Sequence, residues 1–175
     1  MKKRLALLCA AATCLLVVAP SAAVASSETQ TFELEMEVPN VAQAPNGDMV
    51  AVTGHGEFSV HPKSVEASGS FTHTDSEGNV KGAGTWEATQ LLSYQSYGCG
   101  VVFGIPLPEN LCGGKVMMRV LLTTPIGQFK GTLWVFCVIG PNPPNSVEEG
   151  VRLSVPGIIN FNDVVTGMNV YIRTS

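Results

Sequence analysis

The chain has 175 residues, with 10 Lys and Arg against 14 Asp and Glu, and its formal net charge is −4 at pH 7. Because this balance is acidic, it argues against a phosphate-binding surface, and so against nucleic acid and anionic membranes as partners. A chain of this length is typical of one domain that buries a sizeable core without needing disulfides or a metal.

The first 25 residues have the three-part layout of a secretory signal peptide. Residues 2–4 are Lys-Lys-Arg, residues 5–19 are an apolar run, and residues 21–25 are small, with the expected cleavage site after Ala25. This leader holds three of the 10 basic residues and none of the 14 acidic ones, so the mature chain has a net charge of −7. We therefore expect a secreted, extracellular protein in which residues 26–175 form a single β domain. No second apolar run is long enough for an integral membrane span.

The first part of the mature chain alternates with a period of two. Phe32, Leu34 and Met36 are separated by glutamates, which predicts a half-buried strand with its acids in water. Residues 46–48 (Asn-Gly-Asp) and 75–79 (Asp-Ser-Glu-Gly-Asn) are typical turns. Between and around them we expect strands over residues 49–61, 60–71, 69–74 and 80–94.

Glycine precedes an aromatic residue by two positions at three places in these strands. The segments are Gly-Glu-Phe at 56–58, Gly-Ser-Phe at 69–71 and Gly-Thr-Trp at 84–86. Glycine in a closed sheet marks a bend at which a neighbouring side chain fills the interior. The repeated pattern therefore slightly favours a barrel over a flat sandwich.

The second part of the chain continues the strand pattern and contains no convincing helix. Pro-Ile-Gly at 125–127 predicts a hairpin, and the Pro-rich residues 141–145 predict a surface loop. We expect strands over 116–124, 128–139, 151–155, 158–162 and 168–173. The predicted fold is all-β, either an antiparallel β-barrel of calycin-like size with 8–10 strands or, as second choice, a β-sandwich. The predicted core is Phe32, Leu34, Met36, Phe58, Val60, Phe71, Trp86, Met118, Val120, Leu122, Trp134, Phe136 and Val170.

Three cysteines remain after the leader. Cys99 and Cys112 flank a Pro-rich loop, and closing such a loop stabilises a secreted domain by about 3 kcal/mol in the chain-entropy model. Cys137 lies in an apolar run and is typical of a small buried side chain. We expect a Cys99–Cys112 disulfide and a free Cys137, with Cys112–Cys137 as the open alternative.

The histidines are the candidates for chemistry. His55 and Glu57 share one face of a predicted strand, and His73 on the next strand could complete a divalent metal site or an acid–base group with them. Histidines on a solvent-facing sheet explain the same pattern without a ligand, and we favour that interpretation, with no cofactor. No nucleophile motif or phosphate-binding loop accompanies them.

Residues 94–112 form the most distinctive loop, with Tyr94, Tyr97 and Phe103 among prolines and apolar residues. If a disulfide closes it, this loop could be a rigid binding surface, or it could be a plug at one end of a barrel.

The function that these patterns favour is a non-enzymatic domain that binds a small apolar ligand or a surface partner such as an extracellular protein or glycan. The alternative is an enzyme, metal-assisted or acid–base, that works at a barrel mouth with His55, Glu57 and His73.

Overall fold

The computed structural model describes residues 28–175, and the predicted signal peptide lies outside the described residues. This part of the chain is all-β, which confirms the predicted class. It contains no helix of the length and apolar character needed to cross a membrane. The strands are β1 (Thr31–Met36), β2 (Asn40–Gln43), β3 (Met49–Val60), β4 (Lys63–Thr74), β5 (Val80–Cys99), β6 (Val101–Val102), β7 (Ile105–Pro106), β8 (Leu111–Thr124), β9 (Gly127–Cys137), β10 (Gly150–Val155), β11 (Ile159–Phe161), β12 (Asp163–Thr166) and β13 (Asn169–Arg173).

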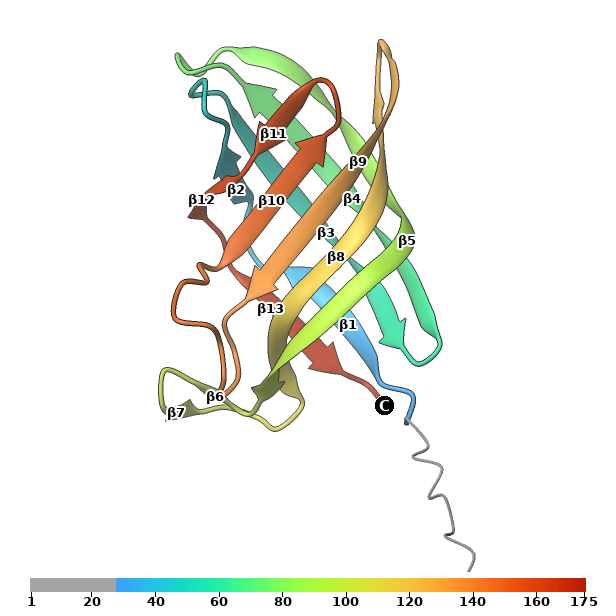
Figure 1. Ribbon diagram of the computed structural model, residues 1–175, viewed down its shortest axis with the longest axis vertical. Helices are drawn as coiled ribbons and strands as arrows, with labels where there is room; N and C mark the ends of the chain where they lie inside the picture. The colour runs from blue at the N-terminus through green and yellow to red at the C-terminus, as the bar shows by residue number, and fades with distance from the viewer. Residues whose placement is uncertain (1–27) are drawn as a thin grey trace, which may run out of the picture.

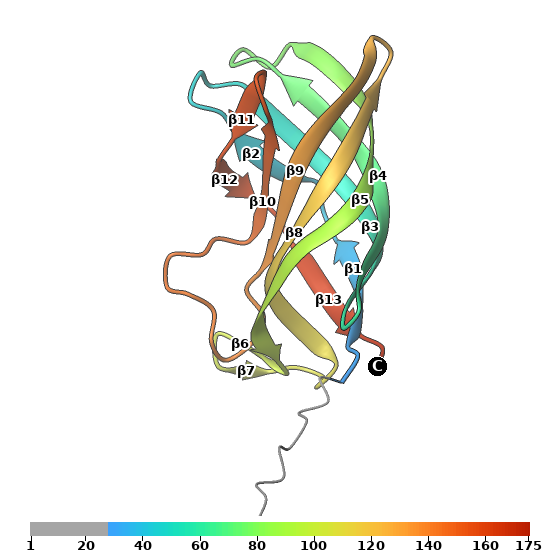
Figure 2. The ribbon, with the colours of Figure 1, turned by 45° about the vertical axis from the view of Figure 1, so that its right-hand side comes forward.

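Six antiparallel strands close a ring of hydrogen bonds. The order around the ring is β1, β3, β4, β5, β8 and β13, and β13 returns to β1. On one side β8 also pairs with β9, which continues through β10 to β11. On the other side β3 pairs with β2, and β2 pairs with β12. Figures 1 and 2 show these strands surrounding one elongated interior. The closed ring is compatible with the predicted barrel and also with a sandwich.

The alternation in β1 gives the interior its first wall. Phe32, Leu34 and Met36 are buried, whereas Glu33 and Glu37 are exposed, as the period of two predicts. Burial of each large apolar side chain contributes about 1.5–3 kcal/mol, so this face fixes the register of the strand. The rest of the interior contains Phe58, Phe71, Trp86, Met118, Val120 and Leu122, as expected.

Two predicted core residues face differently from the expectation. Trp134 and Val170 are only half-buried, because their neighbours Leu133, Val135 and Tyr171 occupy the inward positions. Every residue from 133 to 139 is apolar, so alternation along this run could not separate the two faces.

Gly69 of the repeated pattern lies in one cross-strand row with Gly54 and Trp86. Gly54 pairs with Gly69, and Gly69 pairs with Trp86. The Trp86 indole is 1% exposed, and its Nε1 donates a hydrogen bond to the Thr53 carbonyl oxygen at 2.8 Å. A Cβ atom on Gly54 would lie 2.3 Å from the Trp86 ring. The absence of a side chain at Gly54 therefore provides space that the indole occupies.

A polar network crosses the interior where β2, β9, β10 and β13 meet. Asn40 and Asn169 exchange side-chain hydrogen bonds at 3.0 and 2.9 Å, and the Asn169 amide also donates to the carbonyl oxygens of Phe136 and Gly150. The Glu149 carboxylate accepts from the backbone N–H groups of Val138 and Asn169. Burial raises the pKa of Glu149, and these two hydrogen bonds partly oppose the rise.

The cysteines pair as expected. Cys99 and Cys112 lie opposite each other in the β5–β8 ladder and form the disulfide, and Cys137 is free and buried. Burial and the nearby Glu149 charge raise the pKa of Cys137 to about 12. Since the thiolate is the reactive form, the native environment suppresses the chemistry of this thiol.

We expect iodoacetamide at pH 8 to alkylate Cys137 about a thousandfold more slowly in the folded protein than in the urea-unfolded, unreduced protein, whose thiols have ordinary pKa values. Peptide mass spectrometry over a time course measures both rates. Equal rates in the two states would contradict the buried position of this side chain.

Candidate ligand-binding site

A cavity of about 170 Å³ opens at the end of the molecule that carries the β2–β3, β4–β5, β8–β9 and β10–β11 turns, which is the upper end in Figure 1. Its walls come from β3, β4 and β5 and from the segment β8–β11. They are lined by Val50, Phe71, His73, Lys81, Gly82, Leu122, Thr124, Ile126, Phe129, Leu153, Val155, Ile158, Ile159 and Phe161. Most of these side chains are apolar, which is typical of the lining of small-molecule sites.

The size of the cavity limits what fits. A dry apolar cavity of about 150 Å³ holds benzene. The rim adds two exposed apolar residues, Ile126 at the β8–β9 turn and Ile158 at the β10–β11 turn, which are 88% and 62% exposed. An apolar ligand that extends beyond the cavity would meet these side chains.

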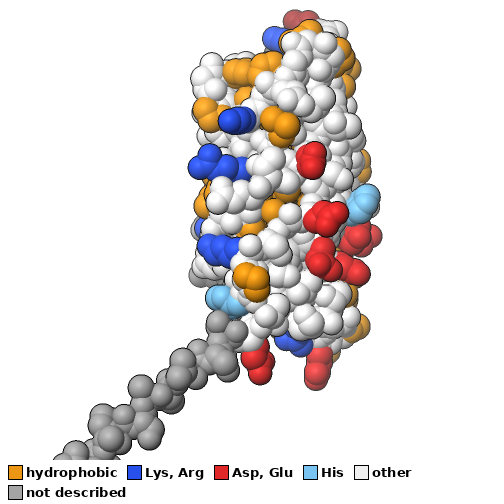
Figure 3. All heavy atoms as spheres, turned by 90° about the vertical axis from the view of Figure 1, so that its right-hand side faces the viewer, with side chains coloured by type: hydrophobic (Ala, Val, Ile, Leu, Met, Phe, Trp, Pro, Cys, Tyr) orange, Lys and Arg blue, Asp and Glu red, His pale blue; other side chains and the backbone are white. Residues whose placement is uncertain are grey.

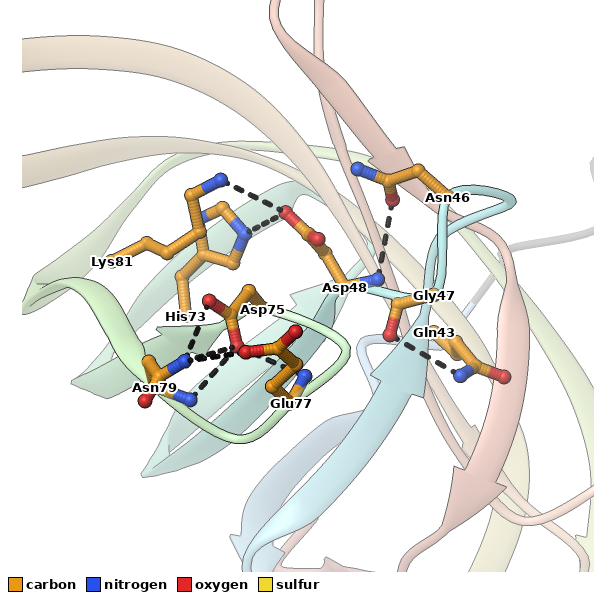
Figure 4. Close-up of polar contacts among 9 residues, drawn as sticks. All are labelled: Gln43, Asn46, Gly47, Asp48, His73, Asp75, Glu77, Asn79 and Lys81. Carbon is orange, nitrogen blue, oxygen red and sulfur yellow. Dashed lines mark hydrogen bonds and ion pairs between the residues drawn. The ribbon is translucent and has the colours of Figure 1, made fainter.

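Three charged or titratable residues gather beside the cavity: Asp48, His73 and Lys81 (Figure 4). Asp48 ends the β2–β3 turn, in which the Asn46 side chain accepts the Asp48 N–H at 3.2 Å and Gly47 has a φ of +85°. His73 lies near the end of β4, opposite Val50, and Lys81 lies at the start of β5. Two hairpin ends therefore bring these side chains together.

The geometry of the cluster orients the His73 imidazole. His73 Nε2 lies 2.8 Å from Asp48 Oδ2, and the Asp48 side chain is only 8% exposed. Because an ionised carboxylate only accepts hydrogen bonds, Nε2 carries the proton, and in the neutral ring Nδ1 is then an acceptor. Lys81 Nζ lies 3.9 Å from the same carboxylate oxygen and balances its charge.

The β4–β5 turn, which connects the strands of His73 and Lys81, is held by hydrogen bonds to Asp75. Asp75 Oδ1 accepts hydrogen bonds from the backbone N–H groups of Glu77 and Asn79. Hydrogen bonds from Asn79 lower the pKa of Asp75, so this carboxylate keeps its capping role at low pH. Because this hydrogen-bonded turn joins β4 to β5, it keeps His73 and Lys81 close together beside the cavity.

The structure does not bring the three predicted metal-site residues together. His55 and Glu57 point to the outer face of β3, whereas His73 lies two residues from the inward-facing Phe71 and lines the cavity. Within residues 28–175 no group of three or more His, Cys, Asp and Glu side chains could hold a metal ion. His73 pairs with the buried Val50 and shares its inner face, whereas His55 pairs with the exposed Ser68 on the outer face.

His55 and Glu57 belong instead to an acidic trough on the outer face of β1, β3, β4 and β5. Its carboxylates come from Glu33, Glu35, Glu57, Glu66 and Glu87. Figure 3 shows acidic side chains gathered on one side of the view, and most Lys and Arg side chains on the other. Like charges along an exposed sheet disfavour pairing with another sheet, which explains the trough without a ligand.

The three aromatic residues of the predicted binding loop have different positions. Tyr97 is buried, and Tyr94 is half-buried against Phe32 and Phe58 and donates its hydroxyl to the Gly113 carbonyl oxygen. Phe103 is 83% exposed at the turn between β6 and β7, where it has a φ of +48°. Of the three, only Phe103 exposes its ring to solvent.

Sequence reasoning missed Asp48, Lys81 and the apolar walls of the cavity. A signal for Asp48 was present, because a short turn at His61-Pro62 places Val50 opposite His73 and so brings the preceding turn to the end of β4. The cavity walls from β8 to β11 come from strands far along the chain from His73, so no local sequence pattern predicts that they meet it.

Comparisons of the whole chain with protein-family models, with curated proteins and with solved structures find no match.

Proposed function

We propose that this protein is a secreted domain that binds a small apolar molecule in the cavity at the open end of the ring. The observation that carries the proposal is an apolar cavity of about 170 Å³ with one polar cluster at its mouth. Apolar walls provide affinity, and a few placed polar groups orient the ligand, which is the usual composition of a small-molecule site. The leader and the disulfide agree with an extracellular setting.

The size of the site sets the expected affinity. Burial of about 150–200 Å² of ligand surface contributes about 4–5 kcal/mol, which corresponds to a Kd of about 0.2–1 mM for a single-ring hydrocarbon. Larger apolar ligands that also contact Ile126 and Ile158 would bind more tightly.

Toluene is a suitable probe of the proposal. We expect saturable methyl chemical-shift changes at lining residues such as Leu122, Leu153 and Ile159, together with a rise in Tm that depends on toluene concentration, because a ligand that binds only the folded state stabilises it. The Val155→Phe variant fills part of the cavity and should weaken binding at least tenfold.

The matched control is Val170→Phe, at a half-buried position outside the cavity lining, which should leave the affinity unchanged. Toluene binding that saturates equally in both variants, or shift changes confined to residues outside the lining, would refute the proposed site.

Acid–base catalysis at the same mouth is a second candidate function. The observation that favours it is the hydrogen bond between His73 and Asp48, because an imidazole oriented in this way accepts a proton at Nδ1. His55 and Glu57, on the outer face, take no part in it.

A further inference from the structure

We infer that the ligand of this cavity is a phenol: a single aromatic ring that fills the apolar part, with a hydroxyl group that meets His73 and Lys81 at the mouth. This inference rests on the proposed function and assigns the chemistry of the ligand. The hydroxyl hydrogen is donated to His73 Nδ1, and the hydroxyl oxygen accepts a hydrogen bond from Lys81 Nζ.

His73 provides the acceptor. Its Nε2 is engaged with Asp48 Oδ2 at 2.8 Å, and within residues 28–175 its Nδ1 has no hydrogen-bond partner. The ring lines the cavity and packs edge-on against Phe161, another lining residue, with ring centroids 5.3 Å apart. The acceptor atom is therefore held on a fixed ring beside an apolar wall, where a ligand hydroxyl gains from pairing with it.

Lys81 provides the donor. Its side chain is 52% exposed, and its Nζ lies 3.9 Å from Asp48 Oδ2, which is a charge contact beyond hydrogen-bond distance. The ammonium protons are therefore available to a ligand oxygen. The other polar side chain of the lining, Thr124, donates its hydroxyl to the Gly127 carbonyl oxygen at 2.9 Å and is already engaged.

The charges of the cluster select a neutral ligand group. Asp48 and Lys81 offset each other, and the His73 ring is uncharged when it offers Nδ1 as an acceptor. A charged ligand group of either sign would be attracted by one of these two residues and repelled by the other, so the pair gives neither sign a net advantage. A hydroxyl is both donor and acceptor and matches the two available groups without adding charge.

The remaining volume selects the body of the ligand. A cavity of about 170 Å³ holds one aromatic ring with a small substituent. Phe71, Phe129 and Phe161 lie in its walls, and aromatic side chains pack against a ligand ring in offset or edge-on arrangements.

The test compares 4-methylphenol with toluene and 4-methylbenzoate, which share the methyl-substituted ring and differ in the polar group. We expect 4-methylphenol to bind at least tenfold more tightly than toluene, and 4-methylbenzoate to bind no more tightly than toluene. Calorimetry or methyl chemical shifts give all three dissociation constants.

Two variants separate the polar groups from the cavity. His73→Leu and Lys81→Met should each reduce the affinity for 4-methylphenol at least fivefold and leave toluene binding within twofold. Their matched controls are His55→Leu on the outer face of β3 and Lys130→Met on β9, which should change neither affinity. Lys81 is exposed, so its variant remains informative even if His73→Leu does not fold.

The possible outcomes distinguish the two proposals. Equal binding of 4-methylphenol and toluene would overturn the phenol assignment and leave the apolar cavity in place. Tighter binding of 4-methylbenzoate would also overturn it, in favour of an anionic ligand. Failure of all three probes to bind would overturn both the assignment and the proposed function.

Discussion

Replacement of Asn169 by Ala is expected to reduce the free energy of unfolding by about 3–5 kcal/mol. The Asn169 amide group donates to three acceptors, the side-chain oxygen of Asn40 and the carbonyl oxygens of Phe136 and Gly150, and its own oxygen accepts from Asn40. Alanine removes these hydrogen bonds from buried partners, although the Asn40 amide keeps its bond to the Val38 carbonyl oxygen, and each buried group left unpaired costs about 1–3 kcal/mol. Asn40 and Asn169 are both buried, so the lost hydrogen bonds are not replaced by contact with bulk solvent.

Urea unfolding followed by tryptophan fluorescence measures the effect, with the m-value used to check that the variant unfolds from an equally compact state. The matched control is Asn162→Ala, at an exposed position between β11 and β12, where we expect a change within about 0.5 kcal/mol. A loss below about 1 kcal/mol at Asn169 would mean that the network does not contribute to stability as its geometry indicates.

This network also illustrates what local sequence could not supply. Asn40 and Asn169 are 129 residues apart, and each lies directly beside apolar residues and close to a turn-forming Pro or Gly. Only the return of β13 to β1 places them together. Alternation of apolar and polar residues predicts which face of a strand is buried, but it does not predict which distant polar side chains will share that interior.

The strands themselves were largely predictable. Phe32, Leu34 and Met36 mark the inner face of β1, and the turns at 75–79 and 125–126 end their strands as expected. The prediction was wrong at Trp134, because every residue from 133 to 139 is apolar and alternation along this run does not show which face is inward. The short strands β2, β6, β7 and β12 were missed, because two to four residues carry too little pattern to be distinguished from a loop.

The candidate site was predictable only in part. His73 was identified as a residue for chemistry, and its inward orientation follows from sharing parity with Phe71. The two residues predicted to act with it, His55 and Glu57, lie on the outer face of the sheet, because side chains point alternately to the two faces of a strand. Asp48 was interpreted only as a turn residue, although the β3–β4 hairpin register brings it beside His73.

The second prediction concerns Gly54, which lies in one cross-strand row with Gly69 and Trp86. Gly54→Ala is expected to destabilise the protein by about 3 kcal/mol or more. The new Cβ would lie 2.3 Å from the Trp86 ring and 2.7 Å from the Ser68 carbonyl oxygen. Neither neighbour has room to move, because Trp86 is fully buried and Ser68 belongs to the β4 backbone ladder, and overpacking of this kind costs about 1–3 kcal/mol before the indole is displaced.

Gly82→Ala is the control, because no atom lies within 4 Å of the Cβ that it would add, and its φ lies outside the left-handed region. We expect this variant to be neutral or slightly more stable, since alanine restricts the unfolded chain. Thermal unfolding of the two variants side by side separates a steric role of glycine from a general one. If both lose stability equally, the glycines serve backbone flexibility. If only Gly54→Ala does, Gly54 is required because a side chain at this position would occupy the space of the Trp86 indole.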